Sequence, residues 1–314
     1  MIDSPRAWAL EQNDRCTVFA SGPEATIFAE SRPFRVAQHQ LPVWKAVLPL
    51  GGHAELFQPG RPMVAAPGLI VPPQLAHACA ATSPYIALFI DSWLLPSRPE
   101  PILLGSGEVR RVLAALGTTD SDSPDTRVDL AAGYAELRTL AGRPSLLDPR
   151  VAHAVHLCTT RDPNQPIASI AGEVGLSAPR LRALVRQEVG ITLARLRRWG
   201  RLRTAIAELP DSTAALAAAT AGFADQAHLT RTARDFIGRT PASLRHADAW
   251  ELTPGSCLRA ALVVGEGRGR DGRHLHLDGD TRRSRPESTC GRVGPAPPRA
   301  HPASGTTARR PCAR

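Results

Sequence analysis

Residues 175–192, GLSAPRLRALVRQEVGIT, and residues 222–240, GFADQAHLTRTARDFIGRT, are two versions of one segment. Aligning Gly190 with Gly238 brings the flanking leucines and threonines into register at an offset of 48 residues. Each copy reads as a short helix, a turn that contains glycine, and a second helix, which is the helix-turn-helix pattern. The chain is therefore predicted to hold two helix-turn-helix units.

The second helix of each copy is predicted to turn a short, basic face outward. In the first copy Leu181, Leu184 and Val185 have the spacing of a buried face, and Ser177 is a good N-cap. In the second copy Asp225 is the expected cap. Such helices fit the major groove of duplex DNA, where arginine pairs with guanine and glutamine with adenine. The candidate DNA-binding residues are Ser177, Pro179, Arg180, Arg182, Ala183, Arg186, Gln226, Ala227, His228, Thr230, Arg231 and Arg234.

The segment between the copies, residues 191–209, repeats apolar residues at spacings of three or four and is predicted to be one long helix. Some 17 residues of helix span roughly 25 Å. Together with the widths of the flanking units, this length suits two successive major grooves, ~34 Å apart. Gly200 lies inside the predicted helix, at a cost of roughly 1 kcal/mol relative to alanine.

Charge is distributed unevenly along the 314 residues. Residues 165–247 hold 12 arginines and 6 acidic residues, whereas residues 1–164 hold 14 basic and 16 acidic residues. A basic segment beside a near-neutral one suits a polyanion-binding module joined to a regulatory module. No apolar run is long enough to span a membrane, and the N-terminus does not read as a signal peptide. We therefore expect a cytoplasmic protein without membrane contact, whose six scattered cysteines are free thiols.

The rest of the chain divides into segments of different composition. Residues 15–95 alternate short apolar pieces with Pro, Gly and polar turns, which predicts antiparallel strands. Helices are predicted for residues 107–117 and 127–142. The predicted fold is α+β, divided into an effector-sensing and dimerisation domain (1–142), a linker (143–149), a DNA-binding domain (150–247) and a disordered Arg/Gly/Pro-rich tail (248–314).

Residues 150–247 resemble the C-terminal domain of AraC/XylS-type transcriptional regulators. The resemblance rests on GLSAPRLRALVRQEVGIT, on RLRTA at 201–205 and above all on AGFADQAHLTRTARDFIGRTPASLR at 221–245. It implies two helix-turn-helix units joined by a long helix, and control of transcription, usually activation, with operator DNA, RNA polymerase and a second copy of the chain as partners. The sequence departs from the family at Leu193, where proline is usual, and at Leu196, where tyrosine is usual. By position, the family's base-reading places fall on Pro179, Arg182, Ala183, Gln226, Ala227 and Arg231.

Residues 39–93 resemble the cupin-like effector domain that is fused to many such regulators. GLIVPPQLAHA, residues 68–78, is similar to the second cupin motif and holds His77 near its end. The resemblance implies an N-terminal β-barrel with short helices and a small-molecule effector in the barrel mouth, against His39, Trp44 or His77. The His-x-His and Glu of metal-binding cupins are missing, so we expect no metal and no cofactor.

The sequence contains no assembled catalytic constellation, so the protein is not expected to be an enzyme. Two alternatives stay open. The first is a cupin-type small-molecule enzyme or binding protein with a structural helical domain, which stoichiometric bound metal would favour. The second is a protein-interaction module built on the helical bundle, which predicts no salt-dependent affinity for DNA.

Overall fold

The computed structural model describes residues 6–12, 15–22, 25–117, 128–161 and 165–244, all of which belong to one compact unit. The predicted disordered tail, residues 248–314, lies outside the described residues. Within the described ranges, no helix combines the length and the apolar character that crossing a membrane requires.

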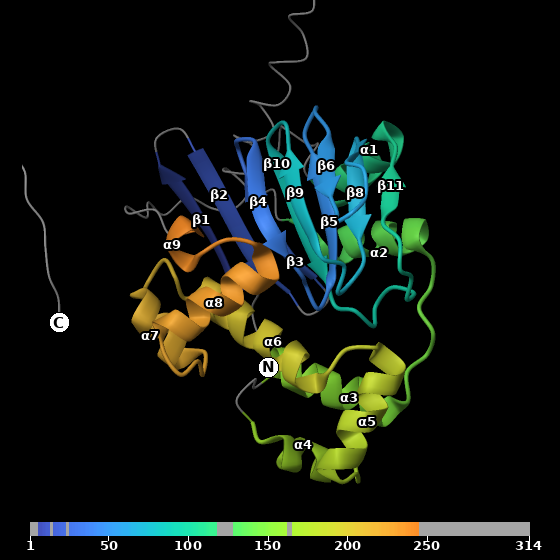
Figure 1. Ribbon diagram of the computed structural model, residues 1–314, viewed down its shortest axis with the longest axis vertical. Coiled ribbons are helices and arrows are strands. Elements are labelled where there is room, and N and C mark those ends of the chain that lie inside the picture. The colour runs from blue at the N-terminus through green and yellow to red at the C-terminus, as the bar shows by residue number, and fades with distance from the viewer. Residues whose placement is uncertain (1–5, 13–14, 23–24, 118–127, 162–164, 245–314) are drawn as a thin grey trace, which may run out of the picture. The chain divides into compact units, whose positions relative to one another are not determined.

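The N-terminal part is rich in strands, as predicted, and its strands form two antiparallel sheets (Figure 1). The seven-stranded sheet has the order β1-β2-β3-β10-β5-β8-β11, and the four-stranded sheet has the order β4-β9-β6-β7. The bounds are β1 Arg6–Gln12, β2 Arg15–Ser21, β3 Ala25–Glu30, β4 Phe34–His39, β5 Trp44–Pro49, β6 Ala54–Phe57, β7 Val64–Ala66, β8 Gly68–Val71, β9 His77–Ala81, β10 Tyr85–Ile90 and β11 Ile102–Leu104.

The two sheets lie against each other and do not close into the predicted barrel. No ladder among the described strands pairs a member of one sheet with a member of the other. The chain passes from β3 to β4 through Pro33, which has no amide hydrogen to continue a ladder. It passes from β5 to β6 through Gly51, whose φ of 103° suits a sharp turn. These connections move the chain to the second sheet, so the expectation of a closed cupin-like barrel is corrected to two open, packed sheets.

Helices cover the outer face of the larger sheet and make up the described part of the chain after β11 (Figure 1). α1 and α2 confirm the two predicted helices after the strands and pack on the larger sheet. The bounds are α1 Ser106–Ala115, α2 Leu130–Ala141, α3 Pro149–His156, the π-helical turn η1 Leu157–Arg161, α4 Ile167–Glu173, α5 Ala178–Val189, α6 Leu193–Ala207, α7 Ala214–Thr220, α8 Gln226–Ile237 and α9 Pro241–Leu244.

Three hydrophobic clusters divide this structure in an unexpected way. One cluster lies between the outer face of the seven-stranded sheet and α1 and α2. A second fills the space between the two sheets and continues without a break into α6, α7, α8 and α9. The third belongs to α3, α4, α5 and the first turn of α6. The second helix-turn-helix unit therefore shares its core with the strands, whereas the first unit has a core of its own.

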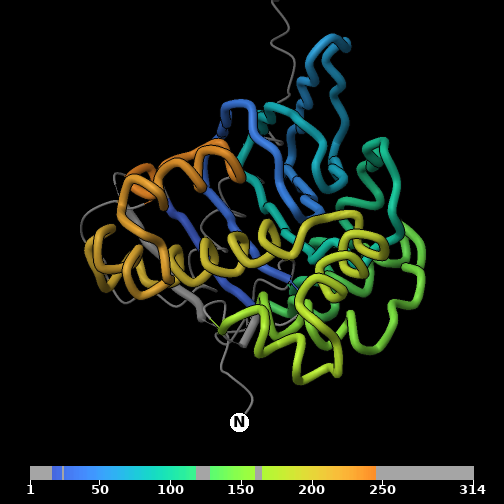
Figure 2. Tube along the Cα trace, turned by 60° about the horizontal axis from the view of Figure 1, so that its bottom comes forward, coloured from blue at the N-terminus to red at the C-terminus, as the bar shows by residue number. Residues whose placement is uncertain are grey.

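The long helix α6 joins the two helical units, as the sequence predicts (Figure 2). Gly200 allows α6 to lie directly on η1, because a Cβ at this position would come within 3.0 Å of the carbonyl oxygen of Thr159. Arg203, one turn further along α6, donates a hydrogen bond of 2.7 Å to the same oxygen. The close approach of two backbones thus explains a glycine that is unfavourable for the helix alone.

The cysteines follow the prediction in part. Cys79 in β9 and Cys158 in η1 are free and buried. Burial raises the pKa of both thiols, to about 11 for Cys158. Cys16 in β2 is disulfide-bonded, so the prediction of free thiols is wrong at this position.

Candidate nucleic-acid interface

The second helix of each repeated unit begins and ends in the same way. The Ser177 hydroxyl oxygen accepts a hydrogen bond from the amide of Arg180 at the start of α5, and a carboxylate oxygen of Asp225 accepts one from the amide of His228 at the start of α8. Each helix ends at a glycine with positive φ, a conformation that costs other residues about 1–2 kcal/mol. Local sequence alone therefore fixes the limits of both helices.

The inward faces are buried as predicted, which leaves the candidate DNA-binding residues outside. Leu181 and Val185 of α5, and Leu229 and Ala233 of α8, each have a relative exposure of 0%. On α5, Pro179, Arg180, Arg182, Ala183 and Arg186 are exposed, and so is the cap Ser177. On α8, the exposed members are Gln226, Ala227, Arg231 and Arg234.

Two of the predicted residues are only half exposed. The His228 ring stands edge-on to the ring of Phe223, with the ring centroids 5.2 Å apart. Thr230 is likewise partly covered. Both lie on the helix that presents Gln226 and Arg231 to solvent, so the fold places them at the margin of the exposed stripe.

Within the described part of the chain, the arginines of the two stripes have no competing acidic partners. To other described residues, none of Arg180, Arg182, Arg186, Arg231 and Arg234 forms a salt bridge. Their charges are therefore available to an external anion. A phosphate or a base edge with two acceptors can bind such a guanidinium through two parallel hydrogen bonds.

The predicted effector residues do not form one group in the structure. His39 ends β4 and His77 begins β9, and their ring centroids are 4.2 Å apart in the space between the sheets. Trp44 belongs to the cluster on the opposite face of the larger sheet, where its Nε1 donates to the carbonyl oxygen of Ser92. Successive strand residues point to opposite faces, and the neighbour that faces the histidines is Lys45.

The two histidines are held in the neutral form. Burial, followed by the charge of Lys45 and by His77, lowers the pKa of His39 to about 2. Burial and then Lys45 lower the pKa of His77 to about 3. The Nδ1 atoms lie 2.8 Å from the carbonyl oxygens of Ala37 and Leu75, respectively. The histidines therefore act at neutral pH as uncharged members of the interior.

Sequence reasoning missed a pocket between the larger sheet and the second helical unit. Its empty volume, counted together with the adjoining open solvent, is about 520 Å³. Aromatic side chains including Phe28, Phe89 and Trp199 form much of its wall, and three cationic side chains, Lys45, Arg203 and Arg239, also line it. Lys45 is the single lysine of the chain, and a lone lysine among so many arginines was the sequence feature that could have pointed to this pocket.

Two of these cations have partners in the protein, and the third lacks an acidic one. Arg239 pairs with Glu30 at 2.9 Å, and Arg203 donates to Thr159. Lys45 is 4% exposed, and its Nζ lies 3.4 Å from Nε2 of His39 but forms no salt bridge within the described part of the chain. Burial, reinforced by the charge of Arg239, lowers the pKa of Lys45.

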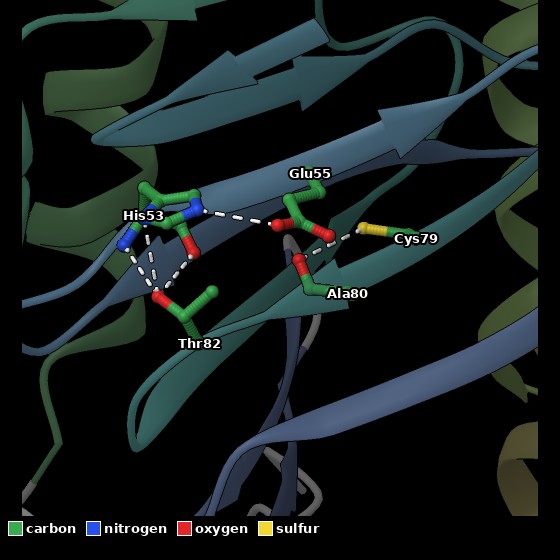
Figure 3. Close-up of polar contacts among 5 residues, drawn as sticks. All are labelled: His53, Glu55, Cys79, Ala80 and Thr82. Carbon is green, nitrogen blue, oxygen red and sulfur yellow. Dashed lines mark hydrogen bonds and ion pairs between the residues drawn. The ribbon is translucent and has the colours of Figure 1, made fainter. Parts of the chain in front are cut away.

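A second polar cluster, His53, Glu55 and Thr82, superficially resembles a catalytic triad (Figure 3). Nε2 of His53 lies 3.2 Å from a carboxylate oxygen of Glu55, and Nδ1 lies 3.3 Å from the hydroxyl of Thr82. The same hydroxyl donates to the carbonyl oxygen of His53 and accepts from its amide. The Thr82 hydroxyl therefore stabilises the connection between two strands. Its proton is donated to the carbonyl oxygen of His53 and is not free for transfer to the imidazole. Among the described residues, no group of three or more His, Cys, Asp or Glu side chains could hold a metal ion.

Comparison with known proteins identifies a family for the helical part. Residues 170–247 match the family described as "Helix-turn-helix domain". No curated protein matches the chain significantly. Apo ToxT from Vibrio cholerae is 13% identical, with a TM-score of 0.45, and the match covers 70% of this chain and 95% of ToxT. The C-terminal domain of AraT from Geobacillus stearothermophilus is 22% identical (TM-score 0.31; 35% and 94% covered). An AraC-type regulator from Chromobacterium violaceum is 25% identical (TM-score 0.29; 31% and 89% covered).

The duplicated units, their exposed arginines and the family match define a DNA-binding helix-turn-helix protein. More particularly, residues 170–247 belong to the family described as a helix-turn-helix domain.

Proposed function

We propose that the protein reads two successive major grooves of one operator, through α5 and α8, and activates transcription in the cytoplasm. The observation that carries this proposal is the pair of exposed, unpaired arginine stripes on two repeated helices joined by α6. The 15 residues of α6 span roughly 22 Å, and the units at its two ends add to this separation. Contact with RNA polymerase and formation of a homodimer belong to the same proposal.

The proposal is tested by selecting random duplex DNA with the full-length protein at two salt concentrations. We expect enrichment of a motif with two half-elements about 10 base pairs apart. Salt-sensitive binding without an enriched motif would reduce the protein to a nonspecific DNA binder. An absence of binding at both salt concentrations would contradict the proposal outright.

Two arginines on the recognition helices are expected to respond differently to truncation. Arg231→Ala should weaken binding to the selected site by about 1–3 kcal/mol and relax the preference at one base pair, because a bidentate base contact is lost. Arg186→Ala should weaken binding to all sequences alike and reduce the slope of log K against log [salt] by about one, because a phosphate contact is lost. Titrations of matched and mismatched duplexes distinguish the two patterns. Equal losses on every sequence for Arg231→Ala would contradict base reading by this residue.

We further propose that the effector is a small apolar molecule with one negative charge, bound in the pocket beside Lys45. The aromatic wall favours an apolar body, and a buried lysine without an acidic partner favours an anionic head. A bound carboxylate would also raise the lowered pKa of Lys45 towards its ordinary value. His39 and His77 lie behind Lys45 and would position its side chain.

Decanoate and decanol provide a matched pair of probes for this pocket. At a concentration 100-fold above its dissociation constant, decanoate should stabilise the full-length protein by about 2.7 kcal/mol. Decanol at the same concentration should stabilise it less, because it lacks the charge and binds more weakly. Lys45→Met should remove the difference between the two probes and leave the fold intact, since methionine fills a similar volume without burying a charge. Thermal unfolding with each probe measures the effect. An equal response of wild type and Lys45→Met to decanoate would contradict the assignment.

A further inference from the structure

The first helix-turn-helix unit needs contacts outside its own core to keep a fixed position. Its core, built from α3, α4, α5 and the start of α6, is separate from the core that the second unit shares with the strands. Trp93, after β10, packs against it from the strand side. Within the helical part, η1 also holds the first unit on α6 at Gly200 and Arg203, so any tie to the strand-rich part acts together with this contact.

A continuous chain of hydrogen bonds supplies such a tie and runs between the C-terminal ends of the two recognition helices. The amide of Gln40 donates to the carbonyl oxygen of Asp235 on α8 at 2.8 Å. Nε2 of Gln40 donates to the carbonyl oxygen of Gln74 at 2.6 Å. Nε2 of Gln74 donates to the carbonyl oxygen of Gly190, the C-cap of α5, at 3.1 Å. Two glutamines of the strand-rich part thus connect α8 to α5.

Gln40 also holds the connecting helix α6. The guanidinium of Arg195 on α6 donates to both the backbone and the side-chain oxygens of Gln40. It also lies over the ring of Phe236 on α8, with 4.9 Å between the guanidinium carbon and the ring centroid. Gln40, in the loop after β4, therefore contacts α6 and α8, and Gln74, in the loop between β8 and β9, contacts α5.

Gln74 adopts a backbone conformation that needs support from its surroundings. Its φ is 63°, and among the described residues it is the only non-glycine with positive φ. Such a conformation costs a residue with a side chain about 1–2 kcal/mol. The amide of Gln74 donates to the carbonyl oxygen of Leu41 at 2.6 Å, which holds the loop in this conformation and aims the side chain at Gly190.

We propose that Gln40 and Gln74 form a clamp that fixes the separation of α5 and α8, and that this clamp determines which spacing of two DNA half-elements the protein accepts. The inference rests on the proposed two-groove reading. Two linked binding units gain affinity from each other only when both can engage together. A rigid separation therefore restricts binding to one spacing, and a loosened one accepts several.

The test uses the full-length protein and duplexes that carry the two selected half-elements at the preferred spacing or two base pairs further apart. Wild type should lose about tenfold or more in affinity on the insertion, because both units can no longer engage together. On the same insertion, Gln74→Gly should lose about threefold or less in affinity. For the preferred spacing, its affinity should stay within about threefold of wild type. Glycine removes the side-chain tie and suits a positive φ, so this variant should fold normally. Gln187→Ala, at an exposed position on α5 that makes none of the clamp's hydrogen bonds, is the matched control and should behave as wild type.

Failure of the clamp and failure of two-groove reading give different results. An insertion penalty as large in Gln74→Gly as in wild type overturns the clamp and leaves α6 and the packing around Trp93 as the elements that set the separation. An unmutated protein that binds no selected duplex, or binds both spacings equally, overturns two-groove reading itself and the clamp with it.

Discussion

Glu30→Ala is expected to lower the free energy of unfolding by about 3–5 kcal/mol, because it leaves Arg239, a cation with only 14% of its side chain exposed, without its partner. Glu30 is 1% exposed at its side chain, and one carboxylate oxygen lies 2.9 Å from a guanidinium nitrogen of Arg239. The other carboxylate oxygen accepts a hydrogen bond from the hydroxyl of Tyr85 at 2.9 Å. Truncation would leave both donors facing a cavity that apolar side chains surround.

The contact joins the two parts of the protein, so its loss should be felt throughout the unit. Glu30 ends β3, and Arg239 follows the C-cap of α8. Urea-induced unfolding, followed by far-UV circular dichroism, measures the change. Glu100→Ala is the matched control, because Glu100 pairs with Arg61 at 2.7 Å with both side chains more than half exposed. Exposed pairs contribute about 0–1 kcal/mol, so a loss as small for Glu30→Ala as for Glu100→Ala would contradict the role of the buried pair.

The helical part could be predicted closely from the sequence because its determinants are local. Ser177 and Asp225 cap helices within three residues of themselves, and Gly190 and Gly238 end them. The apolar spacing of three and four residues identifies the buried face without knowledge of what covers it. Once the inward positions are assigned in this way, the remaining positions of each helix, including the arginines, are predicted to be exposed.

The strand-rich part and its pocket depended on pairings that sequence does not display. Open sheets and a closed barrel share the same alternation of apolar residues, and only the order of strand pairing distinguishes them. Trp44 attracted attention as an aromatic residue, but side chains alternate along β5, and it is the neighbouring Lys45 that faces the pocket. The bond between Gln74 and Gly190 joins residues 116 positions apart, beyond any local pattern.

His39 and His77 are expected to make the protein acid-sensitive between pH 7 and pH 5. Both have a pKa of 6.5 when unfolded, lowered to about 2 and about 3 in the folded protein, chiefly by burial and next by Lys45. Below pH 6.5 the unfolded chain therefore binds more protons than the folded one, and stability falls as the pH falls. Each histidine removes about 1.4 kcal/mol per pH unit once it titrates fully, so lowering the pH from 7 to 5 should cost about 4 kcal/mol for the pair.

The double variant His39→Asn/His77→Asn should lose most of this dependence, since asparagine keeps a donor for the carbonyl oxygens of Ala37 and Leu75 but does not titrate. His53→Asn, at a histidine whose side chain is 48% exposed, is the surface control for the substitution itself. Urea unfolding at pH 7, 6 and 5 measures all three proteins. An unchanged pH dependence in the double variant would place the acid sensitivity elsewhere.

The comparison between proteins at each pH also separates the histidines from the perturbed carboxyl groups. The hydrogen bonds and charge of Arg150 lower the pKa of Asp148 to about 2. The contribution of Asp148 to the stability of the protein is therefore lost only as the pH falls below 3.8, outside the range tested. Burial raises the pKa of Asp91 above 3.8, so protonation of Asp91 in the folded state works in the opposite direction and adds stability as the pH falls. Because wild type and the double variant share Asp91, the difference between their curves reports His39 and His77 alone. That difference should grow steadily below pH 6.5.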